Sequence, residues 1–119
     1  PGAVIVGCSP LSFLIARLFR ERGEPVALID TDPESCPVEP DLKVFINSAL
    51  DTEVLEEAGL ASVGTFLAMT NNGEVNLVLA QRAIEEFAPP RVLAVFPNES
   101  QIPTSAKVQP AFSEEMLLK

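Results

Sequence analysis

A turn and an acidic residue are the parts of this sequence best placed to bind a ligand. The turn, Gly7–Ser12, follows an apolar run of β-branched residues and contains Ser9 and Pro10, which are typical of the first positions of a helix. A strand that leads into a helix through such a turn directs backbone N–H groups and the positive end of the helix dipole at one point, which suits a phosphate. The acid, Asp30, ends a second apolar run 23 positions after Gly7.

This spacing is close to the roughly 20 positions that separate the glycine turn from the ribose-binding acid in dinucleotide-binding proteins. Asp30 could accept hydrogen bonds from both hydroxyls of an adenosine ribose and would repel a 2′-phosphate. Of the Gly-x-Gly-x-x-Gly fingerprint only Gly7 is present, because Ser9 and Ser12 occupy the other glycine positions, and Pro10 removes one N–H donor. The turn therefore favours a Rossmann-like first unit more than it favours a ligand, and Asp30 could equally be an ordinary polar strand end.

Catalytic and metal-binding residues are scarce. The sequence contains no histidine, which removes the commonest general base and every Ser-His or Cys-His nucleophile pair. Its two cysteines, Cys8 and Cys36, fall in different predicted loops and cannot form a zinc site of the usual kind. We expect both to be reduced cytosolic thiols, with Cys8 either a thiol of lowered pKa at a helix N-terminus or a small residue filling a tight turn.

Composition limits the classes of partner. A chain of 119 residues with a net charge of −9 is expected to be one domain, and it has no basic surface for nucleic acid. No apolar run approaches the length of a membrane span, and no signal peptide is present, so we expect a cytoplasmic domain without direct membrane insertion. Because the chain begins almost on the first strand and ends inside a predicted helix at 113–119, we expect an excised piece of a longer protein.

Hydrophobic periodicity predicts alternating strands and helices. Strands are predicted near 4–6 and at 26–29, 42–46, 64–69 and 91–96, and helices at 10–22, 52–58 and from 72 or 73 to 87 or 88. The proline-rich segment 33–41 is predicted to be a loop or a single turn. With right-handed crossovers, this order predicts a doubly wound parallel sheet of order 3-2-1-4-5, with a short sixth strand at 106–109 as an option.

Two helices carry apolar residues whose packing can be anticipated. In the first, Leu11, Leu14, Ile15, Leu18 and Phe19 recur at helical spacing and predict the face that covers the sheet. The third predicted helix is apolar around most of its circumference between Val75 and Phe87. This excess predicts a second packing partner, and self-association is the simplest source of one.

Two segments resemble the family of regulator-of-potassium-conductance (RCK) domains. These segments are Asp51–Leu60, with its Leu-Glu-Glu-Ala-Gly helix end, and Thr65–Leu77, with its Glu-Val-Asn-Leu helix start. The resemblance extends from Val4 to about Gln109. It implies a cytoplasmic, non-enzymatic ligand-sensing domain that forms a dimer or a gating ring and controls a membrane-embedded potassium channel, uptake system or antiporter.

The resemblance also implies a site for NAD or another adenine nucleotide. By position, the phosphate loop would be Gly7–Ser12, the ribose would lie at Asp30 and the following turn, the adenine would lie beside Asn47 and Ser48, and the segment Thr70–Asn72 would face the nucleotide. The implied nucleotide-contacting residues are Gly7, Cys8, Ser9, Pro10, Leu11, Ser12, Asp30, Thr31, Asp32, Asn47, Ser48, Thr70, Asn71 and Asn72. The sequence departs from the family pattern at most of these positions. Asn47-Ser48 replaces Gly-Asp, and Asn71, Asn72 and Gly73 replace acids.

Two other functions remain open from the sequence. A degenerate Rossmann scaffold would bind no nucleotide and serve only assembly. The NAD-binding domain of an oxidoreductase would need a catalytic domain after Lys119 that supplies a histidine, tyrosine or lysine.

Overall fold

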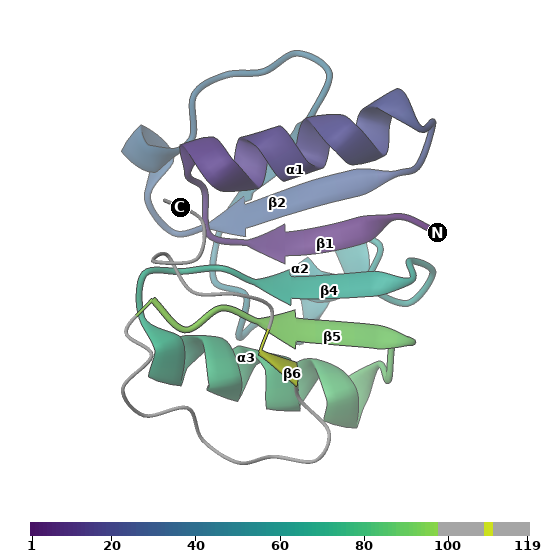
Figure 1. The fold of residues 1–119 in the computed structure, drawn as a ribbon, viewed down its shortest axis with the longest axis vertical. Coiled ribbons are helices and arrows are strands. Elements are labelled where there is room, and N and C mark those ends of the chain that lie inside the picture. Colours follow the sequence, from purple (N-terminus) through teal and green to yellow (C-terminus); the bar gives the residue numbers. More distant parts are fainter. Residues whose placement is uncertain (98–108, 111–119) are drawn as a thin grey trace.

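The computed structural model describes residues 1–97 and 109–110, which form a single sheet covered by helices on both faces (Figure 1). The strands are β1 (Ala3–Val6), β2 (Val26–Asp30), β3 (Lys43–Ile46), β4 (Thr65–Ala68), β5 (Arg91–Ala94) and β6 (Gln109–Pro110). The helices are α1 (Pro10–Glu21), α2 (Thr52–Glu57) and α3 (Gly73–Glu86), together with a 3₁₀ turn, η1 (Pro33–Ser35), in the proline-rich segment.

All strand pairs are parallel, in the order β3-β2-β1-β4-β5-β6. The central strand β1 is buried along its whole length, as expected of β-branched residues covered on both faces. The doubly wound sheet and its strand order are therefore confirmed, and a short sixth strand lies beside β5. The predictions for 98–108 and 111–119, including the helix at 113–119, lie outside the described residues.

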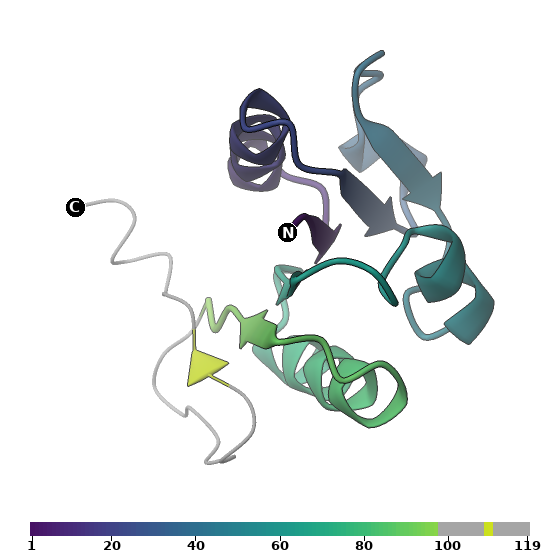
Figure 2. The same ribbon diagram turned by 90° about the vertical axis from the view of Figure 1, so that its right-hand side faces the viewer.

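The helices divide the core into two layers (Figure 2). On one face α1 packs on β1 and β2 through Phe13 and Ala16, and on the other face α2 and α3 pack on the sheet. The apolar face predicted for α1 is partly wrong, because Leu14 and Leu18 are about half exposed. The buried face instead contains Ser12, Phe13 and Ala16, since small residues let the helix axis approach the sheet closely.

Local signals set the ends of the helices. Ser9, Asp51 and Asn72 cap α1, α2 and α3, each accepting a hydrogen bond from a backbone N–H of the first turn. Gly59 ends α2 with a positive φ of 94°, and the Leu60 N–H donates to the Leu55 carbonyl at 3.0 Å, as in a Schellman motif. Within the described part of the chain, no helix combines the length and apolarity that crossing a bilayer requires.

Candidate nucleotide site

Two adjoining cavities lie at the carboxyl ends of the central strands, where parallel α/β sheets bind their ligands. The larger, of about 760 Å³, lies between the turn after β1 and the ends of β4 and β5. The smaller, of about 220 Å³, lies between the ends of β1, β2 and β3 and the start of α3. Both are lined by Gly7, Asp30, Thr31 and Thr70, so these four residues form the boundary between the two cavities.

Gly7 lets the chain turn at this boundary. Its φ is 104°, and a Cβ added there would lie 2.6 Å from the Met69 carbonyl oxygen and 2.9 Å from the Thr70 nitrogen. A side chain would therefore meet the backbone that directly follows β4 as well as an unfavourable φ. The glycine brings the turn after β1 against the end of β4.

The backbone N–H groups of the turn are mostly committed to the protein itself. Gly7 N–H donates to the Ile29 carbonyl at 2.8 Å, Cys8 N–H to Asp30 Oδ2 at 2.7 Å, and Ser9 N–H to Ser12 Oγ at 2.7 Å. Ser12 N–H donates to Ser9 Oγ at 3.1 Å, which closes a capping box, and Pro10 has no N–H. Within Gly7–Ser12, only Leu11 has an N–H without an acceptor among the described residues.

Asp30, the last residue of β2, is fixed by two backbone donors. Its Oδ2 accepts from Cys8 N–H, and its Oδ1 accepts from Asp32 N–H at 2.9 Å. A carboxylate oxygen can accept two hydrogen bonds, so each oxygen keeps capacity for one further donor. The carboxylate is thus held in one orientation at the boundary of the two cavities, with room to accept from a pair of hydroxyls.

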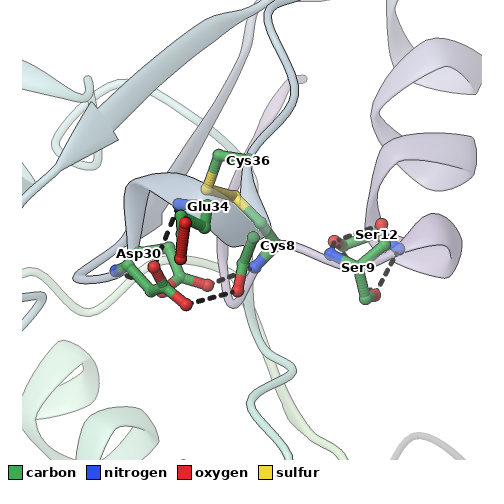
Figure 3. The surroundings of a disulfide bond; sticks show 8 residues. Cys8, Ser9, Ser12, Asp30, Glu34 and Cys36 are labelled. Carbon is green, nitrogen blue, oxygen red and sulfur yellow. Dashed lines mark hydrogen bonds between the residues drawn. A yellow bond between two sulfur atoms is a disulfide. The ribbon is translucent and has the colours of Figure 1, made fainter.

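The expectation that both cysteines are free thiols is wrong in this structure, because Cys8 and Cys36 are joined by a disulfide (Figure 3). Their Cα atoms lie 5.5 Å apart, within the usual range for a disulfide. The two predicted loops follow β1 and β2, which are neighbouring parallel strands, so both loops emerge at the same edge of the sheet. Strand adjacency, and not sequence spacing, brings the sulfurs together.

A residue to which the sequence analysis gave no role holds Thr70 and Val95, which line the larger cavity. Asn76, in α3, is fully buried. Its Oδ1 accepts from Thr70 N–H at 2.9 Å and from Thr70 Oγ1 at 2.5 Å, while its Nδ2 donates to the Thr70 carbonyl at 3.0 Å and the Val95 carbonyl at 2.7 Å. One amide therefore ties together the segments that follow β4 and β5. A polar residue among the apolar positions of α3 is the signal that could have identified it.

The remaining predicted site residues divide into those that face a cavity and those that do not. Cys8, Ser9, Pro10, Leu11 and Asn71 line the larger cavity, and Asn47 and Ser48 line the smaller one. Ser12, Asp32 and Asn72 line neither; they are engaged in the capping interactions of α1, η1 and α3. The walls also include residues that the sequence analysis did not single out for a site, among them Ser35, Met69, Val95 and Pro97.

Comparison with known protein families identifies the family to which the chain belongs. The model of the TrkA-N domain family matches residues 3–109, which is nearly the whole chain. The chain belongs to the TrkA-N domain family. The resemblance to RCK-type domains drawn from the two sequence motifs is thereby confirmed.

This TrkA-N domain is similar in sequence to Trk system potassium uptake proteins and similar in fold to several solved structures. It is 32% identical over 98 residues to a Trk system potassium uptake protein TrkA homolog of Methanothermobacter thermautotrophicus, covering 80% of this chain and 45% of that protein. The chain thus spans less than half the length of that relative. A crystal structure of GsuK bound to ADP matches with a TM-score of 0.69 and 22% identity, over 82% of this chain and 26% of the other.

A short-chain dehydrogenase/reductase superfamily protein with bound NAD, from Agrobacterium tumefaciens, matches with a TM-score of 0.62 and 15% identity, over 83% of this chain and 33% of the other. These two structural likenesses establish the shared fold of the TrkA-N domain.

Proposed function

We propose that this TrkA-N domain is a cytoplasmic, non-enzymatic regulatory module of a potassium channel or transporter, and that it binds NAD or another adenine nucleotide at the carboxyl edge of its sheet. The observation that carries this proposal is the position of Asp30. Its oriented carboxylate stands between two adjoining cavities, one beside the turn after β1 and one beside Asn47 and Ser48. Potassium transport as the regulated process is supported by the family and by the TrkA homolog.

The ligand class follows from the hydrogen-bonding capacity of Asp30. Its two carboxylate oxygens can each accept one more donor, which matches the two hydroxyls of an unmodified ribose. No arginine or lysine occurs between Thr31 and Asp41 to pair with a 2′-phosphate. The domain is therefore expected to take NAD or ADP and to reject NADP.

Affinity is expected to be modest. Among the described residues, Leu11 N–H is the one donor of the turn that has no acceptor, so a pyrophosphate would rely on that donor and on the dipole of α1. The net charge of −9 also disfavours an anionic ligand.

Regulation would require that the nucleotide bind one arrangement of the assembled protein more tightly than another. A ligand of equal affinity for both arrangements does not shift the equilibrium between them. Catalysis is not part of the proposal. The sequence has no histidine, and Asp30 is the one carboxylate that lines either cavity among the described residues. We expect no turnover of NAD(H) or ATP by this chain.

The direct test is thermal denaturation with NAD, ADP and NADP. At about a hundred times its dissociation constant, a nucleotide stabilises the folded state by roughly 2.7 kcal/mol, which raises the melting temperature by several degrees. Asp30→Ala is expected to abolish that rise. Asp41→Ala removes the same charge at an exposed position that lines neither cavity, and it should leave the rise intact.

Preference for NADP, or equal responses of the two variants, would contradict the assignment of Asp30. No response to any nucleotide would instead favour the degenerate scaffold that serves only assembly.

Self-association is the second part of the proposal, as a dimer or ring attached to a membrane-embedded channel or transporter subunit. It is supported by apolar side chains left exposed on and beside α3. Val75 is 43% and Val78 53% exposed, and Leu50, which lines the smaller cavity with Val75, is 49% exposed. An apolar face of this kind is commonly covered by a second copy around a two-fold axis.

Light scattering at micromolar concentration should show a dimer or larger species. Val78→Glu should shift it toward monomer, whereas Val38→Glu, at a position that is 93% exposed and distant in sequence from α3, should not. A monomer at the highest attainable concentration would reject this part of the proposal.

A further inference from the structure

The disulfide stands at the wall of the candidate nucleotide site. Cys8 lines the larger cavity, and its N–H donates to Asp30 (Figure 3). Cys36 follows Ser35, which lines the same cavity. Both cysteines are partly buried and pack against the core layer that α1 covers. The covalent bond therefore joins the two segments that flank the ribose-binding acid.

Within the part of the chain that the structure describes, few other contacts hold the segment that contains Cys36. The side chain of Asp32 accepts from Glu34 N–H and Ser35 Oγ, and Cys36 N–H donates to the Pro33 carbonyl, but these bonds lie within residues 32–36, at the start of the segment. Outside it, an exposed ion pair joins Glu39 to Arg17 in α1 at 2.9 Å. An exposed ion pair contributes little, so the disulfide is the principal tether of segment 33–41 to the turn after β1.

We infer that Cys8 and Cys36 are a reversible oxidation site whose partner is a low-molecular-weight disulfide, and that its oxidation state sets the affinity of the nucleotide site. The inference of coupling to affinity rests on the proposed function, whereas the oxidation site itself does not. A tether beside Asp30 gives the oxidised form a preformed cavity wall. In the reduced form, segment 33–41 must be ordered when the nucleotide binds, and that ordering costs affinity.

The oxidation step is a thiol–disulfide exchange. The thiolate of one cysteine attacks a sulfur of the small disulfide, breaks its S–S bond and releases one small thiolate, which leaves a mixed disulfide. The thiolate of the second cysteine then attacks the protein sulfur of that mixed disulfide and releases the second small thiolate. The two cysteines lose two protons and two electrons, and the small disulfide gains both to become two thiols.

Glutathione mixtures test the site without any nucleotide. The protein is equilibrated with reduced and oxidised glutathione at varied ratios. Free thiols are then alkylated to stop the exchange, and the mass of the protein is measured by mass spectrometry. Because the chain has two cysteines only, the expected populations are unlabelled protein and doubly labelled protein, interconverting reversibly. Cys8→Ser and Cys36→Ser should each yield a mixed disulfide with glutathione instead.

Three results would overturn the oxidation site. The bond could resist excess dithiothreitol in the folded protein, the two thiols could be modified independently, or equimolar Zn²⁺ could protect both thiols of the reduced protein from alkylation. The last result would mean that the two thiols and the Asp30 carboxylate, whose ligand atoms lie within 4.8 Å of one another, serve as a metal site.

Proteolysis and nucleotide binding test the coupling separately. Reduction should speed cleavage after Glu34 and Glu39 by a Glu-specific protease roughly tenfold, while cleavage after Glu74 in α3 should not change. Titration with ADP should give a roughly tenfold weaker affinity for the reduced protein, as expected when one or two more residues must be ordered on binding.

Equal affinities in the two states would overturn the coupling. Absence of ADP binding in both states would refute the proposed function and the coupling with it, while the glutathione and proteolysis results would still decide the oxidation site.

Discussion

The two sides of the candidate site are held together by different kinds of bond. On the side of β2, a charged carboxylate, two backbone donors and the Cys8–Cys36 disulfide join loops that are otherwise exposed. On the side of β4, the neutral and fully buried Asn76 amide makes four hydrogen bonds to Thr70 and Val95. The first side depends on redox conditions and has capacity for a ligand, whereas the second is satisfied internally and provides a fixed wall.

Gly7 connects the two sides, and its replacement should have the largest effect. Gly7→Ala places a methyl group 2.6 Å from the Met69 carbonyl oxygen at a φ of 104°, so unfolding free energy should fall by about 4 kcal/mol. Gly23→Ala is the matched control, because its φ is also positive, 73°, but no atom of the described residues, apart from its chain neighbours, lies within 4 Å of the added methyl. We expect it to cost about 1 kcal/mol. Urea denaturation of both variants measures the difference, and equal losses would show that φ, and not the contact with β4, limits Gly7.

Reduction of the disulfide should have the next largest effect. A cross-link between residues 28 positions apart stabilises a folded chain by about 3.6 kcal/mol through the entropy of the unfolded state. The melting temperature should therefore fall by roughly 15 °C in excess dithiothreitol. The Cys8→Ala/Cys36→Ala double variant should have a melting temperature close to that of the reduced protein, and dithiothreitol should not change it. A melting temperature that does not respond to reduction in the unaltered chain would mean that the bond restricts the unfolded chain very little.

Removal of the buried amide should have a slightly smaller effect. Asn76→Ala leaves the Val95 carbonyl and the Thr70 N–H without their buried partner, so the expected loss is about 2–3 kcal/mol. Asn71→Ala, an exposed amide nearby that makes no hydrogen bond through its side chain in the described residues, should cost under about 0.5 kcal/mol. The loss at Asn76 should be the same in oxidised and reduced protein, because it lies on the other side of the site. A loss that depends on the oxidation state would show that the two sides are energetically coupled.

Much of the fold is readable from the sequence because its determinants are local. Ser9, Asp51 and Asn72 start helices, Gly59 ends one, and the prolines of 33–41 exclude a regular helix there. Consecutive β-branched residues mark β1 as a buried strand. Alternation of these elements then restricts the topology to a doubly wound sheet, because crossovers between parallel strands are right-handed. The position of Asp30 at the end of β2 follows from the same local reasoning.

Tertiary structure alone decided the rest. The rotation of α1 that buries Ser12 and Ala16 and exposes Leu14 and Leu18 depends on how closely that helix approaches the sheet. The Cys8–Cys36 pair and the bonds of Asn76 join loops that meet at one edge of the sheet only because their strands lie side by side or nearly so. Periodicity and capping report the neighbours of a residue along the chain, whereas these contacts depend on neighbours across the sheet, which a single sequence does not encode locally.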